Sequence, residues 1–322
     1  MAKFTDRFDR QKNKISFYLT GLLQDACPDQ LFARQLPDIL NDLKPEESDY
    51  ILDRVNYYNR LSQPFSLPDD AVRKSDFSSA KSKAYYYDMR RVVRYFPDDI
   101  RFSPMFGDIV EVPEQPHFLK SRPIARNNVP DNANSVLLKL NSVRHYYHLK
   151  DELAFEQKAD RAVWRGKIYK QWRQTFVTRF HDHPLCDVGH VDTKKPDIPG
   201  LKAFMGIRDQ LKYKYIISIE GNDVATNLKW IMASGSVAMM SQPKYETWFM
   251  EGRLEPGVHY IGLADELADL EEQLEYYNQH PDEVRQIIHN ANQHFQQFMN
   301  HDRERLISLL VMKKYLELSG QI

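Results

Sequence analysis

The sequence predicts an α/β protein whose second half forms a parallel, doubly wound sheet. From about residue 160, short apolar runs of strand length alternate with segments whose apolar residues recur at helical spacing. Alternation of this kind is typical of parallel sheets with helices on both faces. The composition, with 42% hydrophobic and 28% charged residues, is that of a globular protein.

The first half of the chain has a different pattern. Residues 1 to about 75 are predicted to be mainly helical, with prolines between the helical stretches. Residues 81–94 form an amphipathic segment rich in tyrosine and arginine. Prolines break residues 102–150 into short elements, which include a predicted strand at 136–140.

The second half is predicted to alternate regularly between strands and helices. The predicted strands are 161–165, 186–191, 216–219, 237–240 and 259–261, and the predicted helices are 168–180, 203–211, 228–234, 265–277, 282–299 and 302–318. Because 322 residues are many for one domain, we predict two, residues 1–158 and 159–301. The last helix, within 302–322, is expected to pack back across them onto the first.

Composition also limits the function. A net charge of −1 argues against a nucleic-acid-binding protein. Two cysteines cannot build a disulfide framework, which favours a reducing compartment. No apolar run approaches the ~20 residues that span a bilayer, and the N-terminus does not resemble a secretory signal. We therefore expect a cytoplasmic protein.

Residues 213–240 are the most informative segment. A predicted strand there runs into the polar turn Glu220–Gly221–Asn222–Asp223, and a helix follows after Asn227. A strand that turns sharply into a helix presents free backbone N–H groups, where α/β folds bind anions. A connector needs only one helix cap, so this turn is more polar than packing alone requires. The segment predicts a phosphate-bearing ligand.

Three blocks in matching order resemble glycosyltransferase family 90, which includes protein O-glucosyltransferases, fungal capsule proteins and bacterial lipopolysaccharide core transferases. The blocks are Trp164–Arg165–Gly166, the segment 213–236 with its YKY, EGN, LK and SGS motifs, and PGVHYI at 256–261. The resemblance covers residues 160–262 and implies a GT-B fold, with two Rossmann-like domains facing a cleft. It further implies inverting transfer from a UDP-sugar without a metal, with residues 1–158 on the acceptor side and 159–301 binding the nucleotide-sugar.

The resemblance also assigns the donor-binding residues. Arg165, beside Gly166, suits the diphosphate because its planar guanidinium can bind two phosphate oxygens; a surface ion pair is its alternative. Lys229 and the start of its helix would add positive charge. Asn227 stands where the family often has an arginine, so either Arg165 and Lys229 carry the charge or another cation, Lys120 or Arg122, compensates.

The remaining ligand candidates have structural alternatives. Glu220 would accept a hydrogen bond from a sugar or ribose hydroxyl, or simply cap the turn. Gly235 and Ser236 would contact the ligand, or simply end the helix. His181, His183 and His190 match no zinc spacing, and the sequence has no Asp-x-Asp motif, so no metal or other cofactor is expected.

Inverting transfer needs a carboxylate that deprotonates the acceptor hydroxyl. The family places an aspartate in a segment of the form D-x-x-x-V-P, which Asp108 to Pro113 fits. Asp108 is therefore the candidate base. Glu111 is the alternative, and an ordinary turn aspartate is the structural explanation.

The sequence thus predicts a metal-independent inverting glycosyltransferase. Its donor would be a UDP-sugar carrying glucose, galactose or xylose, and its acceptor a glycan or glycolipid of lipopolysaccharide core or capsule. A catalytically inactive nucleotide-sugar-binding protein is the alternative. The basic N-terminus and residues 81–94 suggest peripheral contact with the inner membrane or an anionic acceptor, or only packed tyrosines with solvated arginines.

Overall fold

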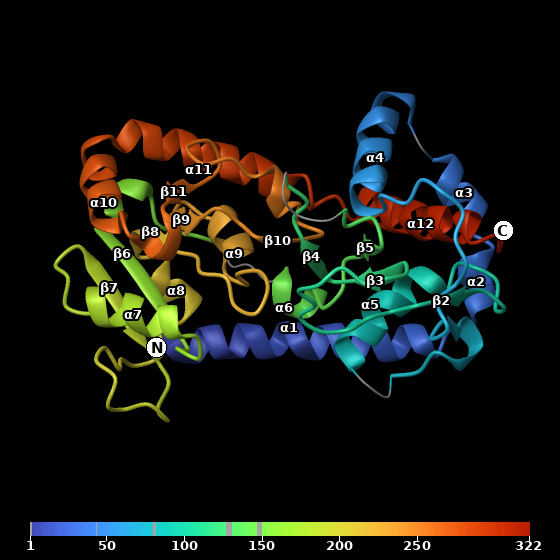
Figure 1. The fold of residues 1–322 in the computed structure, drawn as a ribbon, viewed down its shortest axis with the longest axis horizontal. Helices are drawn as coiled ribbons and strands as arrows, with labels where there is room; N and C mark the ends of the chain where they lie inside the picture. The colour runs from blue at the N-terminus through green and yellow to red at the C-terminus, as the bar shows by residue number, and fades with distance from the viewer. Residues whose placement is uncertain (1, 43, 80–81, 127–130, 147–149) are drawn as a thin grey trace.

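The computed structural model describes residues 2–42, 44–79, 82–126, 131–146 and 150–322 (Figure 1). The helices of the first half are α1 (Ala2–Asp25), α2 (Asp29–Ala33), α3 (Leu36–Asn41), α4 (Pro45–Tyr58), α5 (Lys83–Val93) and α6 (Ser142–His145). Its strands are β1 (Val72–Arg73), β2 (Arg101–Phe102), β3 (His117–Leu119), β4 (Ser121–Pro123) and β5 (Ser135–Leu137). Two 3-10 helices, η1 (Lys74–Asp76) and η2 (Phe155–Gln157), complete it.

The second half contains a five-stranded parallel sheet, which confirms the predicted α/β class. Its strands are β6 (Ala159–Gly166), β7 (Cys186–His190), β8 (Tyr213–Ile217), β9 (Val237–Ser241) and β11 (Ile261–Leu263), in the order β7-β6-β8-β9-β11. The helices are α7 (Gln171–Phe180), α8 (Ile207–Gln210), α9 (Leu228–Met232), α10 (Leu270–Gln279), α11 (Pro281–Gln296) and α12 (His301–Leu318). The remaining elements are β10 (Tyr245–Thr247), η3 (Glu251–Arg253) and η4 (Asp265–Leu267).

The sheet is buried on both faces, as its near-continuous apolar strands require. Along β6 and β8, alternate residues enter two separate hydrophobic clusters. Val163 and Ile216 belong to a cluster that extends through the first half of the chain. Ala162 and Ile217 belong to a second cluster, which α7, α10 and α11 cover.

The first half shows three two-stranded sheets rather than a second large one within the described residues. β1 pairs with β2 and β3 with β5, while β4 pairs with β10 from the other half. One hydrophobic cluster is also common to both halves. The GT-B layout of two facing Rossmann-like domains, and the boundary at 158/159, therefore stay predictions. No described helix is both long and apolar enough to cross a bilayer.

Several predicted element bounds were wrong. No sharp turn joins β8 to α9, because residues 218–227 form a connection between them and α9 has only five residues. The side chain of Asn227 closes this connection by donating to the carbonyl of Ile217. The strand expected at 259–261 begins only at Ile261, because a hydrogen-bonded turn with Gly257 at φ +76° precedes it. The helix expected at 203–211 is limited to α8.

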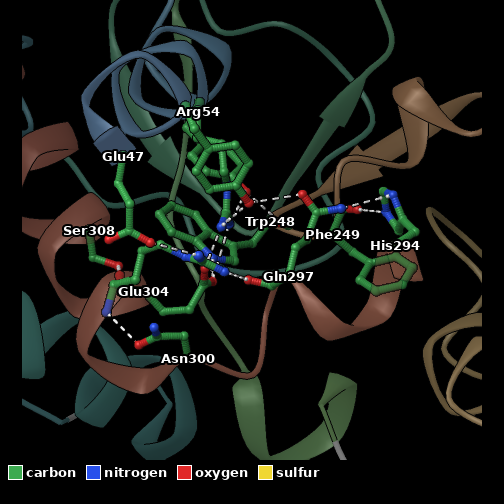
Figure 2. A network of polar contacts seen from close by, with 12 residues as sticks. Glu47, Arg54, Trp248, Phe249, His294, Gln297, Asn300, Glu304 and Ser308 are labelled. Carbon is green, nitrogen blue, oxygen red and sulfur yellow. Dashed lines mark hydrogen bonds and ion pairs between the residues drawn. The ribbon is translucent and has the colours of Figure 1, made fainter. Parts of the chain in front are cut away.

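α12 crosses back to the first half, where it packs against α3, α4 and α5 (Figure 1). A buried polar network holds it there (Figure 2). Arg54 on α4 is fully buried and pairs with Glu304 on α12. Trp248 donates its indole N–H to Glu304 at 2.6 Å and stacks on Tyr58 with ring centroids 3.8 Å apart. One ion pair therefore ties α4, α12 and the segment after β10 together.

Replacing Arg54 with methionine should destabilise the protein strongly, because Glu304 would stay buried without its cation. We expect Arg54→Met to lower the free energy of unfolding by about 3–5 kcal/mol. Urea denaturation at neutral pH measures the change. As a matched control, Arg253→Met breaks the exposed pair with Asp53 and should cost below about 1 kcal/mol. Equal losses in the two variants would contradict the role given to the network.

Candidate functional site

The sheet order places a cavity between the ends of β6 and β8. β6 and β8 are neighbours, but the chain passes from β6 to β7 on one side and from β8 to β9 on the other. The connections that follow β6 and β8 therefore diverge. Ligands of open α/β sheets bind at such switch points, outside the carboxyl ends of the strands. A cavity of about 350 Å³ opens there, lined by both connections and by residues of the first half.

The lining of this cavity is rich in positive charge. Five cationic side chains face it against two carboxylates. The cations are Lys120, Arg144, Arg165, Lys167 and Arg173, and the carboxylates are Asp108 and Asp223. Low-dielectric walls that carry charge of one sign attract ligands of the other sign. The cavity therefore suits an anionic ligand.

Lys120 bridges the two carboxylates of the cavity. Its side chain is only 2% exposed, and its Nζ lies 2.5 Å from Asp108 Oδ1 and 2.7 Å from Asp223 Oδ2. Asp223 also accepts from Ser121 Oγ at 2.6 Å, and Asn222 Nδ2 lies 3.4 Å from Asp108 Oδ2. The ammonium group thus joins the Asp108 loop to the turn after β8. The sequence did not predict this contact between Lys120 and the two carboxylates.

Asp108 lies at the edge of the cavity as a carboxylate. Burial raises its pKa, but the hydrogen bond and charge of Lys120 outweigh burial and hold the pKa below its ordinary value. The group is therefore ionised at neutral pH and able to accept a proton. Glu111, the alternative base, is exposed and is not among the residues that line the cavity.

Arg165 reaches the cavity wall with its charge already paired. Its Nη2 donates to Asp187 Oδ1 at 2.7 Å, and its Nη1 donates to the carbonyls of Asp187 and Trp164. Tyr213 and Lys202 donate to the same carboxylate. Burial opposes ionisation of Asp187, but these donors lower its pKa to about 2. The ion pair foreseen as the alternative for Arg165 is present, and its role as a diphosphate ligand stays a prediction.

Arg122 and Lys229 are interior residues that the structure does not bring to the cavity. Arg122 donates from Nε to Glu246 Oε1 at 2.8 Å and so joins β4 to β10. Lys229 donates to Glu251 Oε1 at 2.8 Å and joins α9 to η3. Both cations and both carboxylates are almost fully buried. Their charges are used to hold the fold together.

Asn227 lines the cavity, but its amide serves the backbone. Its Oδ1 accepts from Ser218 Oγ at 3.1 Å, and its Nδ2 donates to the carbonyl of Ile217 at 3.0 Å. Gly235 and Ser236 lie at the opposite edge of the sheet, before the amino end of β9. Ser236 Oγ donates there to the carbonyl of Tyr213 at 2.8 Å. The helix-end explanation therefore fits Gly235 and Ser236.

At two positions of the cavity wall, an aromatic side chain lies so close to the backbone that only glycine fits. A Cβ on Gly166 would lie 2.5 Å from the indole of Trp164, and a Cβ on Gly221 would lie 2.8 Å from the hydroxyl of Tyr169. Both glycines belong to motifs that carried the family resemblance. Their role in the structure is to let aromatic side chains close over the ends of β6 and β8.

The sequence did not single out Arg173, which ties the two connections together. Its guanidinium is buried and donates to the carbonyls of Ile219 and Glu220 at 3.1 and 2.6 Å, and to that of Lys167 at 3.1 Å. Among the described residues it pairs with no carboxylate, so its charge is not neutralised. Its sequence signal is its place one turn into the helix that follows the Trp164–Arg165–Gly166 motif.

Arg144 and His145 on α6 were also missed, because the resemblance is weak in that region. Arg144 is exposed at the cavity and forms no ion pair within the part of the chain that the structure describes. His145 is 2% exposed, and neither ring nitrogen has a hydrogen-bond partner in that part. Burial and the neighbouring cations, first Lys229, lower the pKa of His145 well below its ordinary value. A neutral imidazole can both donate to and accept from a ligand hydroxyl.

A second cavity, of about 260 Å³, adjoins the first beyond Ile219, Val224 and Ala225, which line both. Glu220 lies in its wall and accepts from the backbone N–H groups of Lys244 and Tyr245, at 2.9 and 3.2 Å. Burial raises the pKa of Glu220 to about 7. The predicted turn cap is therefore present, and contact with a ligand hydroxyl remains a prediction.

Metal ligands do not cluster in the described part of the chain: no three His, Cys, Asp or Glu side chains gather there. His181, His183 and His190 instead contact other groups. His183 faces Glu271, His181 faces Asp182, and His190 Nε2 lies 2.9 Å from the carbonyl of Ile198.

Glu220→Gln should change how stability depends on pH. Folding raises the pKa of Glu220 from 4.5 to about 7, so between these values the folded chain keeps a proton that the unfolded chain has lost. Stability from this group therefore falls as pH rises through that window. Glutamine keeps the acceptor oxygen and removes the titration. The melting temperature of the variant relative to wild type should rise between about pH 5 and pH 7 and then level off. A difference that does not vary with pH would contradict the raised pKa.

Comparisons with known proteins show which proteins this chain is similar to. The model described as Glycosyl transferase family 90 matches residues 136–319. The chain is 47% identical to the O-glucosyltransferase LpsA of Dichelobacter nodosus over 317 residues, which is 97% of this chain and 98% of that protein.

More distant relatives match about half of this chain. Protein O-glucosyltransferase 3 of Homo sapiens is 26% identical over 167 residues, 50% of this chain and 32% of that protein. Protein O-glucosyltransferase 2 of Danio rerio is 26% identical over 170 residues, 51% of this chain and 34% of that protein. The family match includes α6 and the rest of the cavity lining but neither Asp108 nor Lys120.

Proposed function

Because the chain belongs to glycosyltransferase family 90, we propose that it transfers glucose from UDP-glucose to an acceptor hydroxyl, with inversion and without a metal ion. The observation that carries this proposal is the switch-point cavity with five cations and two carboxylates. Glucose is chosen because relatives in both bacteria and animals are named O-glucosyltransferases.

The proposed diphosphate site depends on cations whose charge is not already used. Arg144, Lys167 and Arg173 line the cavity and have no carboxylate partner among the described residues. Fixed positive groups in a partly enclosed site stabilise the charge that develops on the departing phosphate. They would replace both the metal ion and the arginine expected at position 227. The nucleoside would extend into the adjoining cavity, where Glu220 lies.

Asp108 is the proposed base. Its carboxylate would take the proton of the acceptor hydroxyl as that oxygen attacks the anomeric carbon. The new glycosidic bond forms while the bond from the anomeric carbon to the β-phosphate oxygen breaks, and UDP leaves with the bonding electrons. The ionised state and cavity-edge position of Asp108 support this role. Lys120 keeps the carboxylate in place, and His145 is positioned to bind a sugar hydroxyl.

For the acceptor, we propose a glycan or glycolipid hydroxyl of lipopolysaccharide core or capsule, by analogy with the bacterial members that the sequence resembles. A catalytically inactive nucleotide-sugar-binding protein is the second candidate. The observation that favours it is the engagement of Asp108 by Lys120 at 2.5 Å, which an acceptor hydroxyl must compete with.

A panel of UDP-sugars, scored by UDP release in the presence of EDTA, tests the function. UDP-glucose should be hydrolysed or transferred faster than UDP-galactose and UDP-xylose, and EDTA should not abolish turnover. No release from any UDP-sugar, together with a rise in melting temperature on adding UDP, would favour the binding protein instead.

Asp108→Asn should keep affinity for UDP and lose turnover by about 100-fold or more, because removing a general base typically costs 10²–10⁴-fold. Turnover is measured by UDP release and affinity by calorimetry. Glu111→Gln is the matched control, since its side chain is exposed and outside the cavity. Retained turnover in Asp108→Asn, or its loss in the control, would rule out Asp108 as the base.

A further inference from the structure

The outer face of α1 is apolar. Ile15, Leu19, Leu22 and Leu23 recur at helical spacing and are between 55% and 63% exposed. Soluble helices normally turn such residues toward the core. We call these four side chains the α1 stripe. A continuous exposed stripe of this size marks an interaction surface.

The opposite face of α1 is fixed to the protein. Phe17 is buried against Tyr87 of α5, with ring centroids 6.3 Å apart. A Cβ on Gly21 would lie 2.6 Å from the Tyr87 ring, so the helix backbone lies directly on α5. Arg94 Nη2 donates to the carbonyl of Gln24 at 2.7 Å. The helix therefore cannot roll to bury its stripe without losing these contacts.

The charged side chains of α1 differ in whether they have a partner. Asp9 pairs with Arg208 and Asp25 with Arg90, so these acidic residues are neutralised by the protein. Lys12 and Lys14 are exposed and form no ion pair within the described ranges. Lys12 is three residues before Ile15 and so lies on the stripe side of the helix. An apolar stripe with an unpaired lysine beside it has the composition of helices that lie in the interface of anionic membranes.

We propose that α1 docks this protein on an anionic lipid surface, with the stripe inserted among the acyl chains and Lys12 at the headgroups. A second copy of the chain fits less well. It would bring the same unpaired lysine to the contact, and the acidic residues of its α1 that the structure describes are already occupied. This inference does not rest on the proposed enzymatic function.

The basic segment 81–94 is not part of the surface. Within α5, Tyr85, Tyr87 and Met89 are buried. Arg90 and Arg94 both bind the carboxylate of Asp29. The tyrosines of this segment are therefore packed, as the alternative expected, but its arginines are ion-paired rather than solvated.

α1 lies close to elements that line the cavity. Figure 1 shows α1 running along one long edge of the molecule, from α8 past α6 to α5. α6 carries Arg144 and His145 of the cavity wall, and Phe204, which precedes α8, is 55% exposed at the cavity rim. A bilayer held at α1 would lie beside this rim. If the proposed transfer is correct, the acceptor could reach Asp108 while still anchored in lipid.

Vesicle flotation of the full chain tests the proposal. Wild type should float with vesicles of phosphatidylethanolamine and phosphatidylglycerol and bind phosphatidylcholine vesicles weakly. Leu19→Ser combined with Leu22→Ser should reduce the partition coefficient by about tenfold or more, because two inserted side chains are lost. Lys12→Gln should reduce it by about fivefold on the anionic vesicles only.

Leu52→Ser is the matched control, because Leu52 is an exposed leucine on a helix outside the stripe; it should float like wild type. Circular dichroism checks that the variants stay folded. Failure of wild type to bind anionic vesicles, or unchanged binding by the double leucine variant, would overturn the proposal. The proposal would also be overturned if light scattering without lipid showed a wild-type dimer that the Leu19→Ser, Leu22→Ser variant no longer forms. None of these readouts requires glycosyl transfer, so failure here is separable from failure of the proposed enzyme.

Discussion

The ammonium group of Lys120 is the interaction on which the candidate site depends. It is buried beside two carboxylates that come from different parts of the chain, Asp108 from the first half and Asp223 from the turn after β8. Without it, the buried carboxylate of Asp223 and the partly exposed carboxylate of Asp108 would repel each other and any phosphate that entered the cavity. With it, both are held in place, Asp108 stays ionised, and the remaining cations of the wall are left for an anionic ligand. One side chain thus fixes the position and the charge of the proposed base.

The cationic residues of this protein perform two separate tasks. Arg54, Arg122 and Lys229 are buried with carboxylate partners and join elements that lie far apart in the sequence. Such pairs are costly to break, although a well-packed apolar replacement of both partners can be equally stable. Arg144 and Lys167, by contrast, are exposed at the cavity and unpaired among the described residues. Under the proposed function, these cations would serve in place of an arginine at position 227.

The sequence could predict what depends on local pattern. The parallel sheet and the grouping of Gly166, Glu220, Gly221 and Asn222 near one edge of it follow from strand periodicity and from the polar turns at strand ends. Which cations face the ligand did not follow. The partner of Arg122 lies 124 residues away and that of Lys229 lies 22 residues away, and only the folded chain shows that these carboxylates reach them. Arg144 and His145 were also missed. They lie on a four-residue helix outside the repeated strand–helix pattern, where the family resemblance is weak and no local signal marks them.

A crystal structure with bound UDP would test directly whether the donor diphosphate lies at the switch point between β6 and β8. We expect phosphate density within hydrogen-bonding distance of at least two of Arg144, Lys167 and Arg173, and the uracil ring toward Glu220. Density for the diphosphate at another cavity, such as the one beneath α1 between α5 and α12, would contradict it.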